Sequence, residues 1–140
     1  MKYKKLTPNF SVKNVKETVL FYKDVLGFNL EMLVPTNEKT IETTLSENRS
    51  YDYAMMRKDN VFVMFLEENN LRKDMPSLEN VPRGASLLFY IDVEDIDTVY
   101  ESLNGKVDIV KTIEKTWYGM KEFYIKDCNG YILGYGEKDL

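Results

Sequence analysis

The sequence contains no histidine and only one cysteine, Cys128, among its 140 residues. The absence of histidine excludes Ser-His and Cys-His nucleophilic pairs. It also removes the commonest metal ligand and the commonest base near neutral pH. A single cysteine cannot form an intrachain disulfide, which is typical of a reducing compartment. Any catalysis would therefore depend on carboxylates, lysines, tyrosines or the one thiol.

Long apolar runs and basic blocks are also missing. No stretch approaches the roughly 18 apolar residues that a membrane span needs, and the basic segment 1–6 precedes no apolar run long enough for a signal peptide. The 19 basic residues are interleaved with 23 acidic ones, for a net charge of −4, whereas a phosphate-binding surface needs clustered Lys and Arg. We therefore expect a cytoplasmic protein that binds neither nucleic acid nor membranes.

The patterns that are present describe a strand, a helix and three strands, twice over. Asn14 and Asp95 are the expected helix N-caps, 81 positions apart, and Gly27 and Asn104-Gly105 are the expected helix ends. In the first half, strands are predicted at 4–12, 28–34, 51–57 and 61–66. In the second half, they are predicted at 85–92, 107–115, 119–126 and 131–137. Residues 36–50 are irregular, with a weakly helical centre at 38–45.

This order favours an α+β fold in one domain, residues 1–140. Its parts are two βαβββ modules, at about 4–67 and 85–137, and a linker at about 68–84. Each module would form a curved mixed sheet, and the sheets would surround a cleft. A single ferredoxin-like α+β sheet would give a similar order of elements and is the alternative.

Three motifs resemble the vicinal-oxygen-chelate superfamily, which includes glyoxalases, bleomycin resistance proteins and extradiol dioxygenases. The first is Phe21-Tyr22 followed by Leu26-Gly27-Phe28 at the end of the first helix. The second is the helix at 93–103, and the third is the closing hairpin with Gly119 to Phe123 and Asp127 to Leu133. The resemblance covers residues 5–137, although 36–50 is longer than the family pattern explains.

The resemblance implies paired βαβββ modules, a homodimer and a ligand cleft in which enzymes of the superfamily hold a divalent metal through His, Glu or Gln. Those four positions fall here on Thr7, Met64, Leu88 and Gly134. None of these side chains is a competent ligand for Zn²⁺, Ni²⁺, Mn²⁺ or Fe²⁺. The sequence therefore predicts no metal site and no cofactor.

Strand alternation gives a candidate lining for the cleft. If Met64 and Leu88 face it, their strand neighbours at even positions face it too, while Leu87, Phe89 and Ile91 pack inward. The candidate ligand-binding residues are Tyr53, Met55, Phe62, Met64, Leu88, Tyr90, Asp92, Trp117, Tyr118 and Glu122. Such an apolar and aromatic lining with a few polar anchors, here Tyr90, Asp92 and Glu122, is typical of ligand pockets. Alternatively, Met64 and Leu88 fill the former metal cavity.

No catalytic residue is predicted. The carboxylates near the second helix, Glu94, Asp95 and Asp97, are expected to serve its amino terminus, where negative charge is favoured. Cys128 lies in a turn with Lys126 as the only cation beside it, too little to activate a thiol.

The favoured function is metal-independent binding of a small aromatic or planar compound, which the protein would sequester. One alternative is a lyase or dioxygenase with an atypical metal site, which rests on the superfamily alone. The other is a non-catalytic dimeric domain with a filled cleft.

Overall fold

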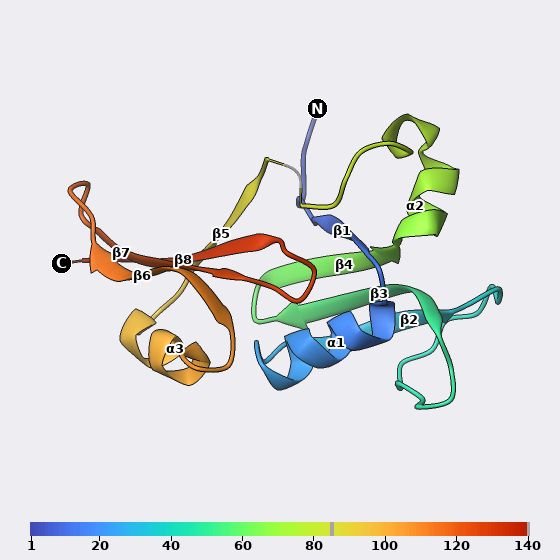
Figure 1. Ribbon diagram of the computed structural model, residues 1–140, viewed down its shortest axis with the longest axis horizontal. Helices are drawn as coiled ribbons and strands as arrows, with labels where there is room; N and C mark the ends of the chain where they lie inside the picture. Colours follow the sequence, from blue (N-terminus) through green and yellow to red (C-terminus); the bar gives the residue numbers. More distant parts are fainter. Residues whose placement is uncertain (85, 140) are drawn as a thin grey trace. The chain divides into compact units, whose positions relative to one another are not determined.

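The chain folds into two compact units, Met1–Val81 and Pro82–Leu140, in a computed structural model that describes residues 1–84 and 86–139 (Figure 1). The boundary falls inside the predicted linker. Each unit contains its own four-stranded mixed sheet. The α+β class with two βαβββ modules is therefore confirmed, and the single ferredoxin-like sheet is wrong. The reading of residues 1–140 as one domain stays a prediction.

The first unit begins with β1 (Asn9–Val12), α1 (Val15–Asp24), β2 (Asn29–Pro35), β3 (Tyr51–Lys58) and β4 (Val61–Glu67). The sheet has the order β1-β4-β3-β2, in which β1 runs parallel to β4 and the other pairs are antiparallel. A short helix, α2 (Glu68–Asp74), and a 3₁₀ turn, η1 (Pro76–Leu78), follow within the predicted linker.

Helix α1 forms as its sequence predicts. The Asn14 side chain accepts a hydrogen bond from the Glu17 backbone N–H at 3.0 Å, which satisfies one of the free donors of the first turn. The apolar side chains of Val15, Val19 and Tyr22 are buried on one side of the helix, and the Tyr22 ring lies 4.7 Å from the Phe65 ring of β4. Gly27 ends the helical segment with a φ of 79°, which glycine adopts without strain. These contacts form the core of the first unit.

The second unit repeats this arrangement with β5 (Leu88–Asp92), α3 (Ile96–Leu103), β6 (Asp108–Lys115), β7 (Met120–Lys126) and β8 (Ile132–Lys138). Its sheet order is β5-β8-β7-β6, again with the first strand parallel to the last. The core lies between α3 and β7, where the Tyr100 ring meets the Phe123 ring at 5.0 Å and Phe123 stacks on Tyr135 at 4.9 Å.

The start of α3 differs from the prediction. Asp95 occupies the N-cap position, but its φ of 54° is left-handed and its side chain makes no capping hydrogen bond. The carboxylate of Glu137 on β8 instead accepts from the backbone N–H groups of Asp95 and Ile96, at 2.8 and 3.1 Å. Asp95 accepts from the Thr98 hydroxyl. The cap thus comes from a residue 42 positions away, which local pattern cannot show.

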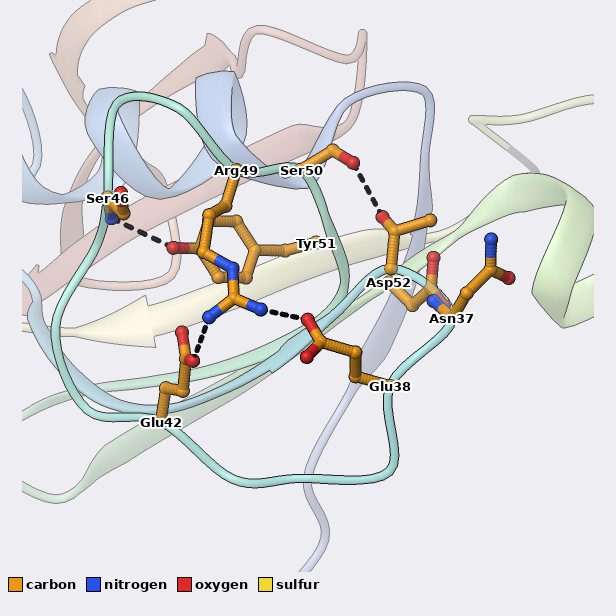
Figure 2. Close-up of polar contacts among 9 residues, drawn as sticks. Asn37, Glu38, Glu42, Ser46, Arg49, Ser50, Tyr51 and Asp52 are labelled. Carbon is orange, nitrogen blue, oxygen red and sulfur yellow. Dashed lines mark hydrogen bonds and ion pairs between the residues drawn. The ribbon is translucent and has the colours of Figure 1, made fainter.

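The two units differ mainly in one connection. Residues 36–50 join β2 to β3, whereas residues 116–119 join β6 to β7. The predicted helical centre at 38–45 is wrong, since the described backbone contains only an isolated bridge between Leu33 and Glu42 there. Figure 2 shows what holds this loop: the Arg49 guanidinium pairs with Glu38 and Glu42. The Tyr51 hydroxyl also accepts from the Ser46 N–H at 2.8 Å.

The first strands of both units are shorter than predicted. Residues 4–8 precede β1, and Ser86 and Leu87 precede β5 rather than belonging to it, while Ala85 lies outside the described residues. Leu87 was predicted to pack inward but is 62% exposed, because it lies before the sheet begins. None of the helices in the described part of the chain is long and apolar enough to cross a membrane.

Candidate functional site

Each sheet contains one of the four family ligand positions on its last strand, and the paired residue on its first strand lies two residues after another of these positions. On the first sheet, Met64 of β4 pairs with Asn9, two residues after Thr7. On the second, Gly134 of β8 pairs with Tyr90, two residues after Leu88. Asn9 and Tyr90 are separated by the same 81 positions as the two helix N-caps. The carried-over positions are therefore related by the internal repeat.

These positions do not fit a metal ion. The space beside Gly134 is taken, since a Cβ built there would lie 2.5 Å from Cε2 of the Tyr124 ring. A ligand side chain at this position would have to displace that ring. Among the described residues, no group of three His, Cys, Asp or Glu side chains is arranged to hold a metal. The side chains at these four positions, Thr7, Met64, Leu88 and Gly134, are not suited to bind a divalent metal.

A hydrogen-bonded cluster occupies this face of the second sheet instead. The Tyr90 hydroxyl of β5 donates to Oε2 of Glu122 on β7 at 2.5 Å. The Tyr118 hydroxyl, from the turn between β6 and β7, donates to Oε1 of the same carboxylate at 2.5 Å. Glu122 is only 4% exposed. Three residues predicted from separate parts of the sequence thus form one cluster, hereafter the tyrosine–glutamate cluster.

The surroundings of the cluster disfavour ionisation of both phenols and raise the pKa of each. Burial, and then the hydrogen bond to Glu122, raise the pKa of Tyr90 well above its usual range. The hydrogen bond to Glu122 is the main cause that raises the pKa of Tyr118. Both phenols therefore remain hydrogen-bond donors at neutral pH, and each carboxylate oxygen accepts one short hydrogen bond.

Gly136 of β8 makes room for the cluster. A Cβ at this position would lie 1.9 Å from the Tyr90 hydroxyl oxygen and 2.4 Å from its Cζ, far inside contact distance. Gly134 plays the same part for the Tyr124 ring, whose pKa is raised by burial. The pair of glycines, separated by one residue, therefore lets two tyrosine side chains approach β8 closely.

The other predicted residues of the second unit surround the cluster without joining it. Leu88 and Asp92 lie on the same face of β5 as Tyr90, and Leu88 is 64% exposed. Trp117 is 95% exposed and its ring meets the Tyr118 ring edge-on at 5.4 Å. Tyr124 was missed, although its alternation with Glu122 along β7 places both on one face.

In the first unit, the predicted residues share the face of the sheet away from α1. Met55 pairs with Met64 across β3 and β4, and Tyr53 lies two residues along β3. Phe62 lies at the end of this row, with the Lys5 ammonium 3.5 Å and the Arg57 guanidinium 5.0 Å from its ring centroid. The row is half-buried and apolar. Prediction missed Met32 and Val34 of β2, which extend this face beside Met55 and Tyr53.

A polar pocket of about 470 Å³ also lies in the first unit, at the carboxyl ends of β1, β2 and β4. It is lined by Lys13, Asn14, Val15, Thr36, Asn37, Ser50, Tyr51, Asp52, Glu67, Asn69, Asn70 and Lys73. Its acidic groups have partners: Glu67 accepts from the N–H groups of Asn69 and Asn70, and Asp52 accepts from the Asn37 N–H. Figure 2 shows the side chains of Asn37 and Asp52, two of these lining residues, near each other. The pocket is polar, unlike the apolar cleft predicted.

The fold and the repeated register define a protein of paired βαβββ units. The family model described as "Glyoxalase/Bleomycin resistance protein/Dioxygenase superfamily" matches residues 7–135. The chain therefore belongs to this superfamily. No protein of curated function is significantly similar in sequence.

Three solved structures illustrate the likeness. A glyoxalase/bleomycin resistance protein/dioxygenase from Nocardioides has a TM-score of 0.71 and 16% identity, covering 99% of this chain and 85% of its own. TioX from Micromonospora sp. ML1 has a TM-score of 0.66 and 14% identity, covering 98% of both chains. A bleomycin-binding protein from Streptomyces verticillus, complexed with copper(II)-bleomycin, has a TM-score of 0.60 and 17% identity, covering 96% of both. At these identities the likeness concerns the fold.

Proposed function

We propose that this protein binds a planar or aromatic small molecule and holds it without chemical change. The observation that carries the proposal is the tyrosine–glutamate cluster, in which two partly exposed tyrosines hydrogen-bond through their hydroxyls to the buried carboxylate of Glu122. Tyr90 is 44% exposed and Tyr118 is 51% exposed, so their rings are open to a ligand although their hydroxyls are engaged. Stacking and edge contacts with such rings favour flat compounds.

Further support comes from the first unit and from the family. The half-buried row of Tyr53, Met55, Phe62 and Met64 offers an apolar surface of its own, and methionine adapts to ligands of irregular shape. The superfamily contains a protein crystallised with copper(II)-bleomycin. We therefore infer sequestration of such a compound in the cytoplasm, by a homodimer. Sedimentation of the purified protein tests the dimer separately.

The ligand proposal is tested by calorimetric titration of bleomycin and a panel of flat aromatic compounds. Emission from Trp117, the only tryptophan, reports binding beside Tyr118. We expect Tyr90→Ala to weaken binding at least about tenfold, because a ring that contacts the ligand contributes on the order of 1.5 kcal/mol. Tyr3→Ala, which removes an exposed tyrosine of the first unit, serves as the matched control. Flat titrations across the panel, or equal losses in both variants, would contradict the proposal.

One observation favours the filled-cleft alternative. The Tyr124 ring covers Gly134, so the space beside this family ligand position is occupied by the protein itself. In that case the function would depend on the dimer surface and not on a ligand. Tyr124→Ala separates the two readings: it should open the face and improve binding of a flat compound if the ring merely fills space. A loss of binding would instead place Tyr124 among the ligand contacts.

A further inference from the structure

Glu122 is a buried carboxylate without a cation. Both of its oxygens accept hydrogen bonds from phenols, which are neutral donors. None of the ion pairs found among residues 1–84 and 86–139 includes Glu122. Removing a carboxylate from water is costly, and neutral donors offset only part of that cost. The cluster therefore has a negative charge that a partner outside the chain can balance.

The charged neighbours do not balance it. Asp92 lies on the same face of β5 as Tyr90, and Glu114 of β6 pairs with Glu122 in register. Lys111 of β6 is close enough to Tyr118 to interact electrostatically, but its ammonium pairs with Glu114 at 2.9 Å. Along β7, the first basic residue on the same face is Lys126, four positions from Glu122. The potential over the cluster is therefore negative.

The rings themselves are suited to a cation. The face of an aromatic ring attracts a cation within about 6 Å, most strongly where water is excluded. Donation of the phenol proton to a carboxylate polarises the phenol and increases the electron density of its ring. In the first unit, Phe62 already has Lys5 and Arg57 over its ring. Across the residues described, no Lys or Arg lies over the rings of Tyr90 or Tyr118.

We infer that the tyrosine–glutamate cluster selects organic cations, such as a quaternary or primary ammonium or an amidinium attached to a planar ring. The charged group lies over Tyr90 and Tyr118 and is attracted by Glu122 beneath them, while the planar part extends toward Trp117. The inference rests on the proposed function, because it assigns a charge to the ligand of the same site. It adds a preference for cationic over neutral ligands, which ring stacking alone does not provide.

The test compares three compounds of one ring size: N-methylquinolinium, quinoline and quinoline-2-carboxylate, at pH 8. Each is titrated calorimetrically into the full chain. Because a unit charge lies close to a screened but largely buried carboxylate, we expect the cation to bind about tenfold or more tightly than neutral quinoline. The anion should bind most weakly. Equal affinities of quinolinium and quinoline would overturn the inference and leave the proposed function intact, whereas no binding by any of the three would count against both.

Glu122→Gln provides the second arm, because the amide keeps the shape and one oxygen acceptor but loses the charge. It should weaken quinolinium binding about tenfold and change quinoline binding less than about twofold. Glu101→Gln, which removes an exposed carboxylate from α3, should bind all three compounds as the wild type does. An equal loss for the cation and the neutral compound in Glu122→Gln would overturn the charge assignment. If circular dichroism shows that Glu122→Gln is unfolded, the wild-type comparison alone decides.

Discussion

Replacement of Gly136 by alanine tests the geometry of the cluster directly. The new Cβ would lie 1.9 Å from the Tyr90 hydroxyl oxygen, so the phenol must leave its place and its hydrogen bond to Glu122 is broken. A hydrogen bond to a charged group contributes about 1.5–3 kcal/mol. We expect Gly136→Ala to lower the free energy of unfolding by about this amount, because Tyr90 is 44% exposed and loses this hydrogen bond when its phenol is displaced.

The effect of Gly136→Ala on the free energy of unfolding should change sign when Tyr90 is already replaced by alanine. The obstacle is then gone, and Gly136 has no left-handed φ that an alanine would resist. Alanine also restricts the unfolded chain, which stabilises a protein by about 0.4–1 kcal/mol at a compatible site. In the Tyr90→Ala background, Gly136→Ala should therefore raise the free energy of unfolding. The coupling between the two positions is the difference of these effects, about 2–4 kcal/mol.

Urea unfolding followed by far-ultraviolet circular dichroism measures all four proteins of this cycle. Gly134→Ala is the matched control, because its Cβ meets Tyr124 and not Tyr90. It should remain destabilising whether residue 90 is Tyr or Ala. If Gly136→Ala has the same cost in both backgrounds, the close approach of Tyr90 to β8 is refuted, and with it the arrangement that holds the phenol on Glu122.

Three further predictions concern the helix cap, the tyrosines and the long loop. Glu137→Ala should lower the free energy of unfolding by about 1 kcal/mol, because two backbone N–H donors at the start of α3 lose their acceptor. Asp95→Asn should change it by less than about 0.5 kcal/mol. Urea unfolding of both variants measures the difference. The pKa of Tyr90 is raised on folding, so its contribution to stability is present below about pH 10 and is lost as the pH rises through the folded pKa. The absorbance difference at 295 nm between wild type and Tyr90→Phe should accordingly titrate above pH 10, and a midpoint at 10 would contradict the assignment. Arg49→Ala should speed cleavage of the 36–50 loop by a glutamate-specific protease several-fold, because Arg49 forms ion pairs with Glu38 and Glu42. Lys39→Ala is the control. Equal cleavage rates of the two variants would show that the ion pairs do not restrain the loop.

The helices and most strands could be predicted because their signals are local. Asn14 and Gly27 bound α1 as their backbone chemistry requires. Along β4, Phe65 alternates with Met64 and packs against Tyr22 of α1. The cap of α3 was mispredicted because its acceptor, Glu137, comes from the far end of the unit. The loop at 36–50 was mispredicted for a related reason. Its residues have weak helical preference, but long-range ion pairs and the bridge to Leu33 determine its path.

For the candidate site, the alternation of residues along the strands identified Tyr90 and Glu122 but not the hydrogen bond between them. Tyr90 and Glu122 were expected as separate polar anchors on one face, since each alternates with inward residues on its own strand. That they share a hydrogen bond depends on the order β5-β8-β7, which places a strand between them. The bond crosses that strand only because Gly136 has no side chain. Sequence alone could not show this use of the glycine.

The family ligand position Gly134 and the tyrosine–glutamate cluster are connected through β8, which contains Gly134 and Gly136. A residue at Gly134 large enough to hold a metal would displace the Tyr124 ring, and one at Gly136 would displace the Tyr90 phenol from Glu122. On this face of the sheet, a longer side chain at Gly134 and the present place of the Tyr124 ring therefore exclude each other, while the hydrogen bond from Tyr90 to Glu122 depends on Gly136. A histidine or glutamate introduced at Gly134 would not by itself rebuild a metal site, because the tyrosine would also have to leave. This face of the second sheet therefore presents tyrosine side chains that are hydrogen-bonded to a buried carboxylate. We expect its function to depend on the ligands that these tyrosines bind.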